Sequence, residues 1–87
     1  MAFKMYNFNF SKDLPKIIMI DKTGLNVSGL FDYLESEYGS EIKKAAIDNG
    51  KLAPKTRVAI NGKQVYDLND IIPDGCELLL TFMLAGG

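Results

Sequence analysis

The sequence has 87 residues, of which 47% are hydrophobic and 24% are charged, and its formal net charge is -1. This length and composition fit one small globular domain and argue against a disordered chain. The nearly balanced charge argues against a general nucleic-acid binder, because there is no basic excess to neutralise phosphates.

The absence of several residue types and motifs excludes further kinds of chemistry. The sequence has no histidine and a single cysteine, Cys76, which excludes histidine-based nucleophiles, bases and metal ligands as well as an internal disulfide. It contains neither a P-loop nor a G-x-G-x-x-G fingerprint, and no apolar run approaches the ~20 residues of a membrane span. We therefore expect a cytoplasmic, non-catalytic protein that binds no cofactor, metal, nucleic acid or membrane.

The first two predicted elements form a hairpin. Residues 3–10 ("FKMYNFNF") alternate along the chain and predict a strand with an aromatic stripe, Tyr6, Phe8 and Phe10, which we interpret as core. After a turn, residues 16–21 ("KIIMID") predict a second strand. Its nearly unbroken apolar run suggests that both of its faces are partly covered.

Two helices are predicted next. Asn26 is a good N-cap for the first helix, and Gly39 suits the position that ends it. Ser40 can cap a shorter second helix, which residues 49–50 ("NG") would end. The apolar stripe of the first helix, at helical spacing, consists of Val27, Leu30, Phe31, Leu34 and Tyr38.

Three short strands complete the chain. Residues 57–60 ("RVAI") and 63–66 flank Asn61 and Gly62, the dipeptide most typical of a two-residue hairpin turn. A "PDG" turn then precedes a last strand over residues 76–83. Its alternation places Leu78 and Leu80 on one face, and Glu77, Leu79 and Thr81 on the other.

This order of elements predicts an α+β domain, with a mixed sheet of four to five strands packed on one main helix plus a short second helix. The arrangement that fits is the β-grasp, or ubiquitin-like, fold, in which the first and last strands pair in parallel at the sheet centre. We expect a single domain over residues 1–83 and a flexible C-terminal tail over residues 84–87.

The last seven residues, "TFMLAGG", carry no charge and finish with Gly86 and Gly87. Chain ends usually collect polar, frayed residues, so this composition suggests a function for the terminus. Two residues without Cβ atoms can thread a narrow channel in any backbone conformation, and a free α-carboxylate is an anion at pH 7. The alternative is that chance or truncation placed two glycines there.

Residues 58–87 ("VAINGKQVYDLNDIIPDGCELLLTFMLAGG") resemble the end of MoaD- and ThiS-type sulfur carriers. That family has a strand, an "NG" turn, a "DG" turn into an apolar strand, and a terminal "GG". Residues 26–39 ("NVSGLFDYLESEYG") and 52–63 ("LAPKTRVAINGK") resemble the family's helix and the approach to its third strand, closest to MoaD. The chain departs from the family at Cys76, where many relatives have aspartate, and at Phe82 and Met83, where prolines are common.

The resemblance implies a sulfur carrier for molybdopterin (molybdenum cofactor) biosynthesis, the small subunit of a molybdopterin synthase. An E1-like adenylating enzyme of the MoeB or ThiF type would use ATP to adenylate the carboxylate of Gly87, which follows Gly86. Sulfur would then replace the adenylate, and the thiocarboxylate would donate its sulfur in the molybdopterin synthase large subunit or another acceptor enzyme. The residues expected to bind the partner enzymes are Phe82, Met83, Leu84 and Ala85.

Other functions fit the same sequence. The chain could be a ubiquitin-like modifier joined to lysines of target proteins through Gly87, a ThiS-type carrier for thiamine thiazole biosynthesis, or a β-grasp binding module with an idle tail. Lys51, Lys55 and Arg57 could receive an acidic partner surface or simply form a solvated loop. We interpret Cys76 as a structural thiol.

Overall fold

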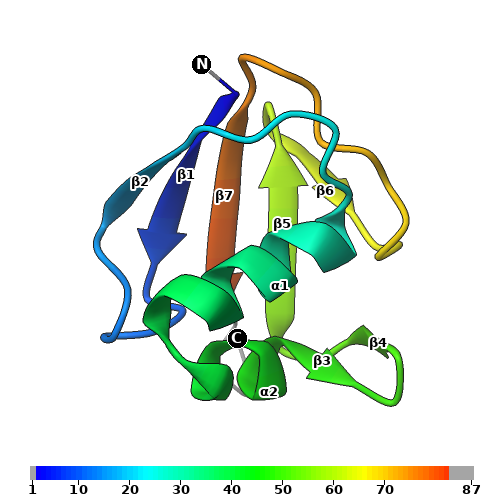
Figure 1. Cartoon of the computed structure of the whole chain (residues 1–87). Helices are drawn as coiled ribbons and strands as arrows, with labels where there is room; N and C mark the ends of the chain where they lie inside the picture. The colour runs from blue at the N-terminus through cyan, green and yellow to red at the C-terminus, as the bar shows by residue number, and fades with distance from the viewer. Residues whose placement is uncertain (1, 83–87) are drawn as a thin grey trace.

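The computed structural model describes residues 2–82 and shows two helices packed against one face of a mixed β-sheet (Figure 1). The helices are α1 (Val27–Tyr38) and α2 (Ser40–Ala46). The strands are β1 (Phe3–Phe8), β2 (Ile17–Ile20), β3 (Ile47–Asp48), β4 (Lys51–Leu52), β5 (Thr56–Ile60), β6 (Lys63–Val65) and β7 (Glu77–Phe82).

Among the described residues, five strands form one sheet in the order β2-β1-β7-β5-β6. β1 and β7 are parallel neighbours at its centre, whereas the β1–β2, β5–β7 and β5–β6 pairs are antiparallel. The first and last strands of the domain therefore meet in the middle of the sheet, as the sequence predicts. The predicted fold class, an α+β β-grasp, is confirmed.

α1 forms because its apolar residues fall on one face and its first turn is capped. The Oδ1 of Asn26 accepts a hydrogen bond from the backbone N–H of Gly29 at 2.7 Å, which satisfies one of the unpaired donors at the helix start. Gly39 ends the helix with a positive φ of 112°, a conformation that a residue without Cβ adopts easily. The helix buries Val27, Leu30, Phe31 and Leu34.

The turn at Asn61 and Gly62 fixes the start of β7 as well as the β5–β6 hairpin. Both residues have positive φ, 51° and 83°, as a type I′ turn requires. In addition, the backbone N–H of Asn61 donates to the carbonyl of Glu77 at 2.8 Å, and its side-chain Oδ1 accepts from the N–H of Glu77 at 3.0 Å. One residue thus ties the turn to the strand that leads into the tail.

The segment around Asn49 and Gly50 differs from the prediction. We expected this dipeptide to end the second helix, but α2 ends at Ala46 and the dipeptide turns the separate two-stranded β3–β4 hairpin. Ile47 is already extended, with φ -122° and ψ 130°, and Asn49 and Gly50 both have positive φ. Asn49 and Gly50 therefore form a hairpin turn, as Asn61 and Gly62 do.

Candidate functional site

The central strand β7 brings the chain to one end of the sheet, next to the predicted tail. Its last pairs place Phe82 opposite Thr56 of β5, and Thr81 between Phe8 of β1 and Arg57 of β5. Two neighbouring strands thus hold β7 up to its final residues. The sheet therefore fixes the point from which residues 83–87 continue.

Of the residues predicted to bind the partner enzymes, Phe82 lies within the described part of the chain. Its side chain is half-buried and packs against the hydrophobic core, so it anchors the end of β7 while leaving part of its surface accessible. The remaining predicted site residues lie outside the described part of the chain: Met83, Leu84, Ala85, Gly86 and Gly87.

The face of the sheet that the helices leave uncovered carries a cluster of apolar side chains. Tyr6 of β1 lies opposite Ile17 of β2 on one side and Leu79 of β7 on the other. Phe8 is 61% exposed and Ile17 54% exposed. We call Tyr6, Phe8, Ile17, Met19 and Leu79 the open-face patch. Contiguous exposed apolar surface of this kind marks an interaction site more often than single exposed residues do.

The open-face patch corrects two interpretations of the sequence. Phe10 is buried in the core as interpreted, but Tyr6 is half-buried and Phe8 is exposed, so these two residues of the aromatic stripe are not core. The second strand is not covered on both faces either, because Ile17 and Met19 are exposed. The common reason is that both helices pack on the same face of the sheet (Figure 1), and a sequence pattern does not reveal which face that is.

The centre of the open-face patch is hollow and its border is polar. A shallow depression of about 510 Å³ lies among Tyr6, Phe8, Ile17 and Leu79. At its border the hydroxyl of Tyr6 donates to Oε2 of Glu77 at 3.3 Å, and Nζ of Lys4 lies 5.8 Å from the centre of the Tyr6 ring. An apolar centre with a charged rim is typical of protein–protein interfaces.

A fixed positive charge lies beside the end of β7. Nη1 of Arg57 donates to the backbone carbonyls of Pro54 and Thr56 at 2.6 and 3.2 Å, and Arg57 is paired in register with Thr81. Lys51 and Lys55 are exposed nearby in sequence. The structure thus places the Arg57 guanidinium near the end of β7.

Two observations on the described residues concern metal binding and thiol reactivity. Among residues 2–82, no group of three or more acidic, cysteine or histidine side chains could hold a metal ion. Cys76 is buried, and burial raises the pKa of its thiol, which disfavours the reactive thiolate. No helix in this part of the chain is long and apolar enough to cross a membrane.

Comparison with known proteins identifies the fold. No protein-family model matches the sequence, and no curated protein matches it. A chain of the Amycolatopsis orientalis BexX/CysO complex superposes with a TM-score of 0.82 at 23% identity, covering 99% of this chain and 100% of that one. Small archaeal modifier protein 1 of Haloferax volcanii gives 0.73 at 18%, covering 95% and 98%. Urm1 from Trypanosoma brucei gives 0.68 at 17%, covering 99% and 95%. The chain therefore shares the ubiquitin-like β-grasp fold with these proteins.

Proposed function

We propose that this chain is a ubiquitin-like carrier or modifier whose Gly87 carboxylate is activated by a separate, ATP-dependent enzyme. The observation that carries the proposal is the position of β7. The strand runs through the sheet centre, borders the open-face patch through Leu79, and is held by β1 and β5 up to Thr81 and Phe82. The residues after it are "MLAGG", so a rigid body would present a short apolar segment followed by two glycines.

The chemistry needs only a carboxylate from this chain. In the active site of the partner, a carboxylate oxygen of Gly87 would attack the α-phosphorus of ATP, and diphosphate would leave. A persulfide sulfur of the partner would then attack the acyl carbon and displace AMP, and reduction of the resulting acyl disulfide by a thiol would leave the thiocarboxylate. Gly86 and Gly87 add no side-chain bulk beside the reacting carbon.

The open-face patch and the end of β7 would dock on the adenylating enzyme together. The patch supplies apolar area with a polar rim, while Phe82, Met83, Leu84 and Ala85 would form an extended anchor entering the partner's channel. In this proposal, residues 84–87 would serve as a flexible tail and the rest of the chain as a non-catalytic domain.

The more specific role we propose is that of a cytoplasmic sulfur carrier in molybdopterin biosynthesis, acting with a synthase large subunit. It is supported by the MoaD-like order of motifs. The second helical segment also favours a MoaD-type carrier over the shorter ThiS type. Rescue of molybdenum-enzyme activity in a host that lacks its own synthase small subunit tests this role. Rescue of a thiazole-deficient host instead would assign the chain to thiamine biosynthesis.

Protein modification is the second candidate function. It is supported by the structural similarity to small archaeal modifier protein 1, whose name describes such a role. The adenylated Gly87 would then pass to a lysine amine, which forms an isopeptide bond and releases the activating group.

Mass spectrometry of the protein isolated from its native host separates the two functions. A gain of about 16 Da on the peptide that ends at Gly87 would mark replacement of one oxygen by sulfur. Gly-Gly remnants on lysines of other proteins would mark conjugation. An unmodified terminus together with an absence of such remnants would contradict both functions.

A further inference from the structure

The sequence contains two Asn-Gly-Lys segments, and the structure places both Asn-Gly pairs in hairpin turns. Asn49 and Gly50 join β3 to β4, and Asn61 and Gly62 join β5 to β6. All four residues are exposed and have positive φ. The two turns therefore share their residue types, the lysine that follows and the sign of φ, and they differ in what surrounds them.

An asparagine that precedes a glycine can lose its side-chain amide without a catalyst. The backbone nitrogen of the glycine attacks the asparagine Cγ, ammonia leaves, and a five-membered succinimide ring forms. One water molecule then opens the ring at either carbonyl, which gives aspartate or an isoaspartyl linkage. The missing Cβ of glycine leaves its nitrogen accessible. In the left-handed turn conformation that nitrogen and Cγ lie apart, so the turn must open before the ring can close.

The turn at Asn61 is tied to the centre of the sheet. The Oδ1 of Asn61 accepts a hydrogen bond from the backbone N–H of Glu77 at 3.0 Å, and the Asn61 N–H donates to the Glu77 carbonyl at 2.8 Å. β5 also pairs with both β6 and β7. Rotation of the Asn61 side chain toward the nitrogen of Gly62 would break its bond to β7 and leave a backbone donor without its partner, so this turn should open rarely.

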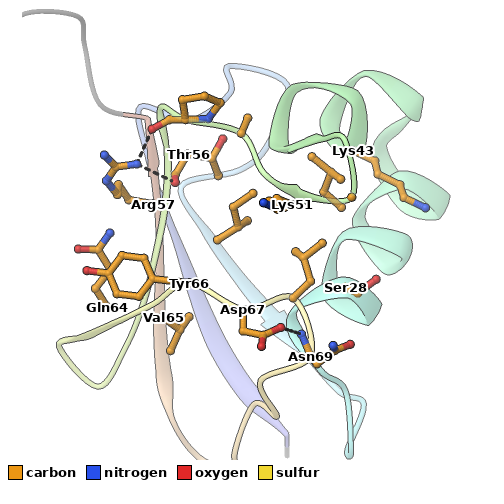
Figure 2. Close-up of a pocket in the computed structure, with 16 residues that line it drawn as sticks. Ser28, Lys43, Lys51, Thr56, Arg57, Gln64, Val65, Tyr66, Asp67 and Asn69 are labelled. Carbon is orange, nitrogen blue, oxygen red and sulfur yellow. Dashed lines mark hydrogen bonds between the residues drawn. The ribbon is translucent and has the colours of Figure 1, made fainter.

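The turn at Asn49 has no such restraint. Within residues 2–82 the Asn49 side chain makes no hydrogen bond, and β3 and β4 join through two residue pairs in a sheet of their own. A groove of about 840 Å³, with Lys51 and Val65 among its lining residues, lies between the hairpin and β6 (Figure 2). The larger sheet therefore gives this turn no support from that side.

We propose that Asn49 is a site of non-enzymatic deamidation in the folded protein and that Asn61 is protected from the same reaction. Deamidation would place a new carboxylate two residues from Lys51. The isoaspartyl product would also insert the Cβ atom into the main chain of a two-residue turn, so Asp48 and Lys51 would lose their pairing register. The site does not depend on the fate of Gly87.

The base of the hairpin should keep the change local. The N–H of Ala53 donates to the carbonyl of Ala46 at 2.7 Å, and Ile47 and Leu52 pack against the core. Deamidation at residue 49 should therefore alter the turn and leave the five-stranded sheet intact.

The test is incubation of the full chain at mildly alkaline pH, with and without denaturing urea, followed by trypsin digestion and mass spectrometry. Trypsin cleaves after lysine and arginine, so the two sites fall on separate peptides, residues 45–51 and 58–63. In the folded protein Asn49 should deamidate at least about tenfold faster than Asn61. In urea the two rates should converge, because both asparagines precede Gly-Lys.

Two outcomes of this experiment would overturn the proposal. One is a rate at Asn61 in the folded protein that equals or exceeds the rate at Asn49. The other is a folded protein that keeps its Asn49 amide over an incubation that converts the unfolded chain.

A pair of glycine variants provides the matched comparison, because glycine tolerates the positive φ of both turns. Asn49→Gly should remove most of the deamidation mass gain of the intact folded protein. Asn61→Gly should remove little of it, with circular dichroism confirming that each variant is folded. The opposite order would show that the hydrogen bonds to Glu77 do not protect Asn61.

Discussion

Leu79 and Leu80 are adjacent in β7 and have opposite environments. Leu80 is fully buried under the helices, whereas Leu79 is 37% exposed in the open-face patch. Alternation along the strand separates them cleanly, because successive side chains point to opposite faces of a sheet. The pair therefore allows the stability of the domain and the recognition of its partner to be altered one at a time.

Leu79→Gln should reduce activation with little loss of stability. The variant removes apolar contact area from the docking surface, so we expect the KM of the adenylating enzyme for this chain to rise about tenfold. The free energy of unfolding should fall by less than about 1 kcal/mol. Enzyme kinetics and urea unfolding measure the two effects, and an unchanged KM would argue against the patch as the docking surface.

Leu80→Ala is the reverse case. It leaves a cavity in the core and should lower the free energy of unfolding by about 2–5 kcal/mol, a large share of the stability of a small domain. Any loss of activation should follow the unfolded fraction measured under the same conditions. A stable Leu80→Ala variant with a raised KM would mean that the two faces of β7 have been assigned the wrong way round.

Cys76 should make the stability of the fold depend on alkaline pH. Burial raises the pKa of its thiol above its usual value near 9.0, so the folded state keeps the proton longer than the unfolded chain does. The stability from the neutral thiol is fully present below the unfolded pKa and is lost as the pH rises through the folded pKa. The stability difference between wild type and Cys76→Ala, from urea unfolding, should therefore shrink above about pH 9. A constant difference would mean that the thiol is not buried in solution.

At the scale of elements, the long periodic segments could be predicted and the shortest could not. The α1 stripe, its Asn26 cap and the Asn61 and Gly62 turn all follow from local chemistry. The β3–β4 hairpin was missed because two strands of two residues each are too short to show alternation. The Asn49 and Gly50 dipeptide was the available signal, and it was interpreted as the end of a helix.

The candidate site, too, could be predicted from the sequence only in part. The motifs of the last strand are local, so its alternation and its central position could be predicted from the sequence. The open-face patch could not, because exposure of Phe8, Ile17 and Met19 depends on which face of the sheet the helices cover.

The cap of α1 provides a prediction for a single element. Asn26→Ala removes the acceptor for the Gly29 N–H and should lower the free energy of unfolding by about 0.5–2 kcal/mol. Asn26→Asp retains an acceptor oxygen of nearly the same shape and should cost much less. Equal losses for the two variants in thermal or urea unfolding would show that the cap bond is not what stabilises the helix start.

For the whole molecule, the layered fold separates the surfaces that partners would use. The helices cover one face of the sheet and leave the open-face patch on the other (Figure 1). The end of β7 is fixed by its neighbours on both sides. This arrangement fits the proposed function, in which several enzymes would bind the same domain in turn and the chemistry would take place on its terminal carboxylate.

The most direct test of the proposed function is to delete the residues that carry the terminal carboxylate. Deletion of Gly86 and Gly87 should leave thermal unfolding unchanged, because glycines have no side chain to contribute to a core, and should abolish ATP–pyrophosphate exchange by the adenylating partner. Lys63→Glu, a charge change remote from the end of β7, serves as the control and should retain exchange. Undiminished exchange by the folded deletion variant would contradict the proposal that Gly87 is the activated group.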